Sequence, residues 1–227
     1  MGKDGREMKR LAMAVTFGFL ALPALIGAPP AHAAPEAKAA ATAPTMSATD
    51  LRNGMRKLWS EHTIYTHSYI VSAVAGLPDL PAVTQRLLRN QDDIGNAIKP
   101  IYGDEAGKKL AALLRDHILI AADIVKAAKA NDTKAVEAGQ KRWRQNGNDM
   151  AAFLAAANPQ WKQVALTDML QKHLDFVTQQ VVARIKMDWA ADIKASDAGF
   201  DHMMMFADML SDGIIKQNPK KIIISEK

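Results

Sequence analysis

The 227-residue chain contains no cysteine, few aromatic residues and no sustained alternation of apolar and polar positions. Without cysteine it can form no disulfide, thiolate nucleophile, cysteine zinc site or lipidated cysteine anchor. A metal site would have to use His, Asp, Glu, Met or backbone oxygen. The missing alternation argues against β-sheets. Neither Gly-x-Ser-x-Gly nor a glycine-rich phosphate loop occurs, so the common serine hydrolase and nucleotide-binding classes are not indicated.

Charge is also close to balanced over most of the chain. The 29 Lys and Arg and 24 Asp and Glu residues give a net charge of +5. Four of these basic and two of these acidic residues lie in residues 1–34, so the remainder has 25 and 22 and a net charge of +3. No block of Lys or Arg is interleaved with aromatics, and nucleic acid is therefore not expected as a partner. The 48% apolar and 23% charged shares are typical of a globular domain.

The N-terminal segment, residues 1–34, has the pattern of an export signal. A charged start precedes the apolar run LAMAVTFGFLALPALIGA, and the small-residue sequence Ala31-His32-Ala33 follows. We predict a cleaved signal peptide at 1–34 and an exported protein, periplasmic or secreted. A retained anchor is the alternative, but Pro23 and Gly27 interrupt the run, so no stable membrane span is expected after cleavage. Residues 35–46, rich in Ala and Pro, predict a flexible tether.

A helical period begins after this tether. Ser47, with Asp50 three residues later, has the pattern of a helix N-cap, and apolar residues then recur at intervals of three and four. Turn signals fall at 76–79, 100–103, 131–132 and 158–159. A further turn is predicted either at 187–188 or at 195–199. We predict an all-α domain, a bundle of about six helices over 47–218, followed by a C-terminal tail at 219–227.

The sequence also matches itself. LLRDHI at 113 aligns with LWSEHT at 58 and MLQKHL at 169, so a histidine recurs with nearly constant spacing at His62, His117 and His173. Asn90-x-x-Asp93 aligns with Asn146-x-x-Asp149 and with His202-x-x-Met205. These two sets of matches predict three tandem helical hairpins that repeat every 55–56 positions or so along the chain.

Hairpin geometry places the repeated polar residues at one height. Each first-helix histidine and its second-helix counterpart are nearly equally far from the turn between them, and equal distances bring residues of a hairpin to the same level. Apolar neighbours on each helix indicate that these residues face the core; His202, for example, is grouped with Met205, Phe206 and Met209. We therefore predict a central polar layer, with the two aspartates one turn away and within reach: His62, Asn90, Asp93, His117, Asn146, Asp149, His173, His202.

Three functions are open for such a layer. Imidazoles and carboxylates converging in a bundle are able to bind a metal ion or other small ligand, and a divalent transition metal is preferred over haem. Alternatively, hydrogen bonds within the layer only fix helix register in an envelope structural or interaction protein. An enzyme of unknown reaction is the third possibility. The di-iron Glu-x-x-His pattern and the haem-attaching Cys-x-x-Cys-His are both absent, so no particular cofactor is indicated.

Three nearby features are interpreted more simply. His202-Met203-Met204-Met205 has ligand types that suit copper(I), but consecutive helical residues point in different directions, which favours core packing. His67 is five positions from His62 and is expected on a solvent-facing or interface side. Asp116 lies about 100° around the helix from His117 and is expected at the edge of the core, paired with a basic side chain.

Five segments resemble a bacterial family of small exported or surface helical proteins: LRNGMRKLWSEHTIYTHSYIVSA, LLRNQDDIGNAIKPIYG, LLRDHILIA, AANPQW and FADMLSDGIIKQNPKK. The resemblance covers nearly all of the predicted domain. It implies that seven positions carry the same residue types across the family: His62, Asn90, Asp93, His117, Asp149, His173 and His202. The position of His67 is usually basic in the family. Some members bear a glycosyltransferase label, which would require a nucleotide-sugar fold with a parallel sheet that this sequence does not encode. The resemblance implies no catalytic residue.

Overall fold

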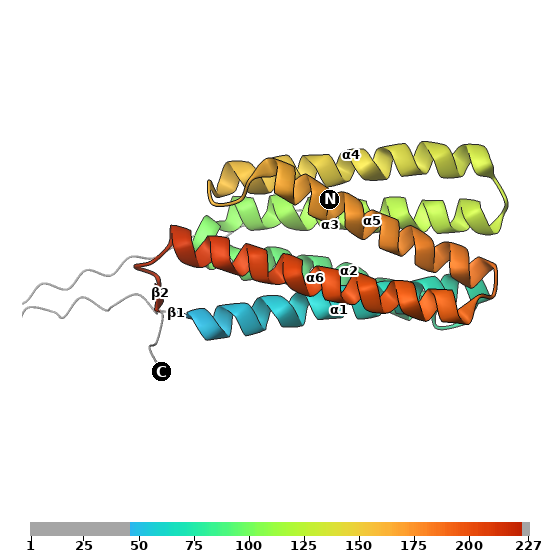
Figure 1. Ribbon diagram of the computed structural model, residues 1–227, viewed down its shortest axis with the longest axis horizontal. Helices are drawn as coiled ribbons and strands as arrows, with labels where there is room; N and C mark the ends of the chain where they lie inside the picture. The colour runs from blue at the N-terminus through green and yellow to red at the C-terminus, as the bar shows by residue number, and fades with distance from the viewer. Residues whose placement is uncertain (1–45, 224–227) are drawn as a thin grey trace, which may run out of the picture. The chain divides into compact units, whose positions relative to one another are not determined.

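A computed structural model describes residues 46–223 of the chain, which form an all-α bundle (Figure 1). The predicted signal peptide, the tether up to residue 45 and the last four residues lie outside the described part. Within it are six helices: α1 (Ala48–Ala75), α2 (Leu80–Tyr102), α3 (Asp104–Lys129), α4 (Thr133–Ala157), α5 (Gln163–Ile185) and α6 (Trp189–Gln217). The predicted fold class is confirmed. The predicted N-cap is present as well, since the Ser47 side chain accepts a hydrogen bond from the Asp50 backbone N–H.

The helices pair into three hairpins, and each hairpin turn contains one residue with a left-handed backbone conformation. The residues Gly76, Asn131 and Met187 adopt left-handed backbone angles, with φ of 69°, 57° and 58°. Each follows the repeated histidine of its own hairpin at the same distance along the chain. In the second and third hairpins the following aspartate, Asp132 or Asp188, caps the next helix through its side chain. The third turn is therefore at 187–188, and residues 195–199 lie inside α6.

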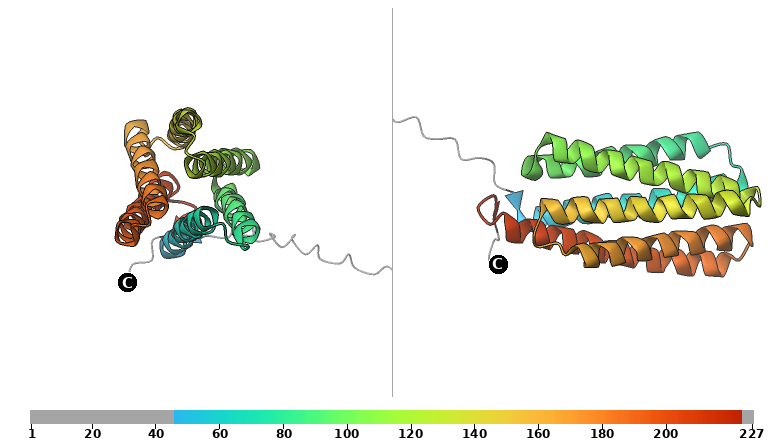
Figure 2. Two further views of the ribbon diagram at one scale, coloured as in Figure 1. Left: turned by 90° about the vertical axis from the view of Figure 1, so that its right-hand side faces the viewer. Right: turned by 90° about the horizontal axis from the view of Figure 1, so that it is seen from above.

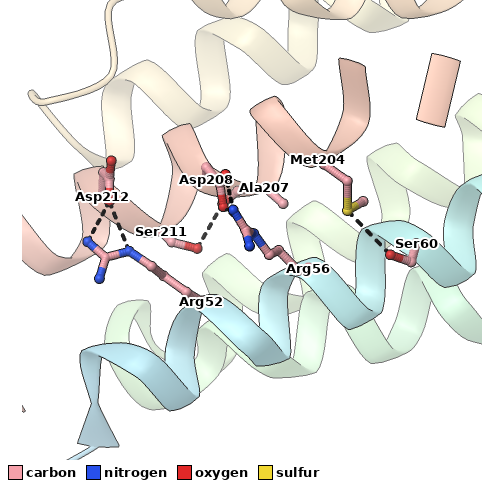
Figure 3. A network of polar contacts seen from close by, with 8 residues as sticks. All are labelled: Arg52, Arg56, Ser60, Met204, Ala207, Asp208, Ser211 and Asp212. Atoms are coloured by element: carbon pink, nitrogen blue, oxygen red, sulfur yellow. Dashed lines mark hydrogen bonds and ion pairs between the residues drawn. The ribbon is translucent and has the colours of Figure 1, made fainter. Parts of the chain in front are cut away.

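The six helices form a closed ring when seen end-on, each packed on the next in sequence and α6 on α1 (Figure 2). α1 also contacts α3 and α5 across the ring. All three hairpin turns lie at one end of the bundle, which we call the turn end (Figure 1). Ladder-like contacts join α6 to α1 (Figure 3): Arg52 to Asp212 at 2.8 Å, Arg56 to Asp208 at 2.6 Å and Ser60 to the Met204 sulfur at 3.4 Å.

A short strand pair fastens the two ends of the described chain. β1 (Met46–Ser47) runs parallel to β2 (Ile222–Ile223), with Met46 opposite Ile222. Ile222 is 2% exposed and belongs to the apolar core. Packed structure therefore extends on both sides of the predicted domain, into the last residue assigned to the tether and into the predicted tail.

Two apolar clusters fill the bundle, one on each side of its middle. The larger lies toward the strand pair and includes Trp59, Leu114 and Phe206. The smaller, toward the turn end, comprises Ile70, Ile124, Val125, Trp143, Leu174, Val177 and Val181. Glycine permits one close helix contact, because a Cβ on Gly95 would clash with the backbone of α3 at Gly107. Among residues 46–223, no helix combines the length and apolarity needed to cross a membrane.

Candidate functional site: a buried layer of imidazoles and amides

The six repeated polar residues are all buried in the middle of the bundle. Their exposed fractions are 2% for His62, 0% for Asn90, 3% for His117, 7% for Asn146, 4% for His173 and 8% for His202. The histidines at 62, 117 and 173 come from α1, α3 and α5, and α1 contacts both of the other two helices across the ring. The sequence repeat thus corresponds to a real structural layer.

The second-helix residue of each hairpin makes the same hydrogen bond. Asn90 donates to the Leu58 carbonyl at 3.0 Å, Asn146 to the Leu113 carbonyl at 3.0 Å, and His202 to the Met169 carbonyl at 2.8 Å. Each accepting residue lies four positions before the first-helix histidine. Because a one-turn slip would break all three bonds, these side chains fix the register of the two helices in each hairpin.

His117 is the first-helix histidine with a firm partner. Its Nδ1 lies 2.9 Å from the Asn146 side-chain oxygen. Since the Asn146 nitrogen is occupied by donating to the Leu113 carbonyl, that oxygen accepts and His117 Nδ1 carries the hydrogen. The Trp143 indole donates to the His117 carbonyl at 3.1 Å, and its ring packs on the imidazole with centroids 5.0 Å apart.

The imidazoles form part of a row of rings across the bundle. Centroids are 5.5 Å apart for Trp59 and His62, 5.5 Å for His62 and His173, 6.0 Å for His173 and His117, and 5.0 Å for His117 and Trp143. His173 is therefore the centre of the row, with one imidazole on each side and an indole beyond each of those. These separations are within the range at which aromatic rings pack on one another.

Burial keeps these three rings neutral. Loss of solvation lowers the pKa of His62 from 6.5 to about 3, the nearby His117 lowers it further, and the Gln91 side chain has a smaller, opposing effect. Burial likewise lowers the pKa of His117 to about 4. The pKa of His173 falls well below 6.5, first through burial and then through the other histidines. A neutral imidazole has one N–H donor and one lone pair, so each ring should have two hydrogen-bond partners or a ligand.

Two of the rings have a buried nitrogen without a well-formed hydrogen bond. Nδ1 of His173 has no partner, and Nδ1 of His62 has none of good geometry, although the Gln91 side chain lies close enough to His62 to raise its pKa through a hydrogen bond. A buried polar atom without a partner is destabilising by about 1–3 kcal/mol, so most such atoms in proteins are explained by a water, an ion or a function. The unpartnered nitrogens are on neighbouring rings in the row. They are the feature of the layer that helix register does not explain.

The structure corrects three sequence predictions about residues near the layer. Asp149 is exposed and accepts a hydrogen bond from Gln145 at 2.8 Å, so it does not reach the layer. Asp93 is half-buried at the edge of α2, where its charge acts on Arg86. Met205 is 58% exposed and does not share the core side of His202. All three lie three positions after a layer residue, and that direction faces outward.

Polar residues that sequence reasoning did not connect form a second cluster near the turn end. Asp192, only 1% exposed, lies 3.1 and 3.2 Å from His67 Nε2 and 3.1 Å from Arg184. His67 itself is 31% exposed and contacts Asp192 on α6, so of its two predicted positions, solvent-facing or interface, the structure shows the interface. Asp192 lies in the first turn of α6, a helix start that the sequence left ambiguous, so no sequence signal marked this carboxylate.

The layer differs from known zinc and haem sites in its ligands and in its space. Within residues 46–223, no group of three or more His, Cys, Asp or Glu side chains is arranged to hold a metal ion. Zinc sites normally need four ligands, or three and a water, and are therefore not matched. Haem does not fit either. The voids inside the bundle next to the imidazoles measure about 20 and 10 Å³, whereas pockets for ligands of that size are hundreds of Å³. A hollow of about 420 Å³ does reach Asn146, but it is open to solvent and its lining includes no histidine to ligate the iron.

Fold and site together define a class: an all-helical bundle of three hairpins around a buried layer of neutral imidazoles and amides. Comparison with protein-family models, with curated proteins and with solved structures gives no match. The resemblance to exported helical proteins accordingly stays a prediction from sequence.

Proposed function

We propose that this protein is an exported binding protein that holds a monovalent transition-metal ion, copper(I), at the unpartnered nitrogens of His62 and His173. The observation that carries the proposal is that helix register is already fixed by Asn90, Asn146 and His202. The imidazoles of His62 and His173 are therefore not needed to fix helix register. Burying apolar side chains of similar volume at these positions would cost less free energy. Neutral imidazole nitrogen is the form that binds metals, and the low pKa of His62 keeps it in that form.

The charge of the surroundings favours copper(I) over a divalent ion. Asp149 is exposed and Asp93 lies at the edge, so no carboxylate within the layer would neutralise a double positive charge. The cost of burying an ion rises with the square of its charge, which makes a monovalent ion far less costly here. Imidazole nitrogen is a suitable ligand for copper, and copper(I) accepts fewer ligands than zinc. Export, which the N-terminal pattern supports, is part of the same proposal.

Anaerobic titration with copper(I), in competition with a chromogenic chelator, tests the proposal. We expect the wild-type chain to take up a single ion and to gain about 2.7 kcal/mol in unfolding free energy at a free-ion concentration of 100 times Kd. His173→Leu should abolish uptake. His202→Gln is the matched control, since it removes a histidine of the same layer while keeping an N–H donor for the Met169 carbonyl. It should bind as the wild type does.

The pH dependence separates this site from adventitious surface binding. Two histidines with an ordinary pKa of 6.5 lose roughly tenfold in metal affinity between pH 7.5 and 6.0, because protons compete for the nitrogens. The lowered pKa of His62 and His173 removes that competition, so affinity should be nearly constant over this range. A steep loss between pH 7.5 and 6.0, or uptake that survives His173→Leu, would reject the layer as the site.

A second function, as an envelope interaction protein, is favoured by a different observation. Four large apolar side chains are exposed near the turn of the third hairpin: Val182 at 44%, Met187 at 70%, Trp189 at 51% and Ile193 at 59%. Exposed apolar groups that gather in this way are typical of protein contact surfaces. A specific partner from envelope extracts should be lost with Trp189→Ser and retained with Val164→Ser, an exposed apolar position on α5 far from that turn.

A further inference from the structure

Met205 differs in character from the residues at the equivalent positions of the other two hairpins. Asp93 on α2 and Asp149 on α4 lie three residues after Asn90 and Asn146, and both are polar, as residues that face outward usually are. Met205 on α6 is apolar and 58% exposed. Single exposed apolar side chains are common in proteins, so the meaning of Met205 depends on what surrounds it.

Met205 shares one side of α6 with two opposite charges. Lys194, Asp201 and Met205 are spaced by seven and four residues, which puts them within roughly 40° of one another around the helix. All three are exposed. Within residues 46–223, neither Lys194 nor Asp201 forms an ion pair, whereas Asp208 farther along α6 is paired with Arg56. An unpaired cation and an unpaired carboxylate therefore accompany the exposed methionine.

A hollow of about 500 Å³ opens next to this side of α6, between α5 and α6. Its lining is mainly apolar and includes three alanines of α6: Ala191, Ala195 and Ala198. Phe176 of α5 and Lys194 are also part of the lining. The volume is in the range of pockets that hold small ligands, so the hollow has room for an apolar side chain. One surface of the chain thus carries an apolar projection, an apolar recess and a charge of each sign.

These features complement one another under a two-fold rotation. When two copies of a helix pack antiparallel about a two-fold axis, every contact occurs twice, because each residue faces the same partner position in the other copy. An axis midway between Lys194 and Asp201 places each of these residues opposite the other in the second copy. The same axis places Met205 opposite Ala190, next to Ala191 in the wall of the hollow. A single axis therefore satisfies both the charges and the apolar contact.

We propose that this side of α6 is the interface of a two-fold dimer of the chain, in which Met205 of each copy packs into the hollow of the other and Lys194 pairs with Asp201. The dimer does not depend on copper(I) binding, since none of these residues belongs to the polar layer. Trp189 and Ile193 lie roughly 100° or more around α6 from Lys194, so the apolar surface at the third turn stays available to another partner.

Exchange of the two charges tests the dimer by sedimentation equilibrium on the full chain. Lys194→Asp alone and Asp201→Lys alone each place like charges opposite one another at both symmetric sites, so the dimer dissociation constant should rise by about tenfold or more. In an equal mixture of these two variants, opposite charges face each other at both sites, and a mixed dimer should form about as tightly as the wild-type dimer. Lys141→Asp makes the same charge change at an exposed position of α4, and this control should dimerise as the wild type does.

Met205→Asn tests the apolar contact. It should also raise the dimer dissociation constant by about tenfold, because a polar side chain gains nothing from entering the hollow, while the exposed position leaves the monomer folded. A wild-type chain that stays monomeric at about 100 μM rejects the dimer. A mixture of the charge variants that fails to dimerise rejects it as well. A dimer that is unaffected by either charge variant or by Met205→Asn uses another surface, which would also overturn the proposal. Copper(I) uptake is measured separately, and its absence would reject the proposed function without bearing on the dimer.

Discussion

Mild acid should destabilise this bundle, mainly through its buried imidazoles. The perturbation is a decrease from pH 7.5 to 5.0. The native pKa is about 3 for His62 and about 4 for His117, against 6.5 for an ordinary histidine. Between pH 6.5 and 5.0 these histidines are therefore protonated in the unfolded chain but remain neutral in the native chain. The stabilisation is fully present above pH 6.5 and is lost as the pH falls toward these native values.

The magnitude follows from linkage. At pH 5.0, an imidazole that binds a proton only in the unfolded state contributes about 2 kcal/mol of destabilisation, so His62 and His117 together remove about 4 kcal/mol. His173, whose pKa is also lowered, acts in the same direction. Typical domains have only about 5–15 kcal/mol of unfolding free energy, so the loss is large. Glu61 and Asp208 contribute little in this window, because their ordinary pKa values of 4.5 and 3.8 already lie below pH 5.0 and their native values are lower still.

Urea unfolding followed by tryptophan fluorescence measures this loss. Trp59 and Trp143 are 3% and 2% exposed and pack on the outer imidazoles of the row, so their emission reports on the layer. The unfolding free energy should fall progressively between pH 7.0 and 5.0. His117→Leu should show a shallower fall, by about 2 kcal/mol at pH 5.0. An unfolding free energy that stays constant within about 1 kcal/mol over this range would refute the assignment of buried neutral imidazoles.

Three further predictions concern packing and backbone. Met187→Gly should raise the unfolding free energy by about 0.5–1 kcal/mol, because glycine adopts the left-handed angle of 58° without strain; a lower melting temperature would count against this. Gly213→Ala should lower the unfolding free energy by about 1–3 kcal/mol, because the new Cβ would overlap the Trp161 indole. Gly54→Ala is the control: a Cβ there meets nothing within 4 Å, so this change should raise the unfolding free energy by up to about 1 kcal/mol. Equal effects of the two substitutions in chemical unfolding would contradict the close contact between Gly213 and Trp161. Asn146→Ala should cost about 2–4 kcal/mol, because it removes the partners of His117 and of the Leu113 carbonyl, and a loss below about 1 kcal/mol would show that the bond does not fix register.

Much of the fold was accessible from sequence because the repeat and the turns reinforce one another. Asn131 and the Asp132 cap mark the second turn unambiguously, and the match of His117 with His62 and His173 then predicts the other two hairpins. The third turn was ambiguous because Met187 is an unusual residue for a left-handed angle, whereas the segment ending at Gly199 resembles a helix end. A third turn at Met187 gives the third hairpin the same length from histidine to turn as the other two hairpins.

The composition of the layer was predictable only in part. Residues three and four positions along a helix both lie near the same side, and sequence alone does not say which faces the core. Here the fourth positions are buried, with Ile94 at 1%, Met150 at 2% and Phe206 at 1%. The third positions, Asp93, Asp149 and Met205, point away. The choice depends on how each helix is rotated within the ring, which is set by its neighbours on both sides.

The contact between His67 and Asp192 could not be predicted from the sequence, for a related reason. It joins the first hairpin to the third across 125 positions, and the repeat relates equivalent residues but not contacts between hairpins. Which imidazole nitrogens stay unpartnered is likewise a matter of ring orientation, for which sequence has no signal. The orientation of the imidazoles is the detail on which the proposed function depends.

The parallel pairing of β1 with β2 brings the two ends of the described chain together at one point of the helical ring. Met46 and Ile222 lie side by side, so a short linker could join the ends of the described chain without moving a helix. The exposed connection at Gly103, between the first and second hairpins, would then serve as the new start and end. Such a circular permutant keeps every hairpin and every contact between neighbouring hairpins. Which hairpin comes first along the chain is therefore set by the connections and not by the packing.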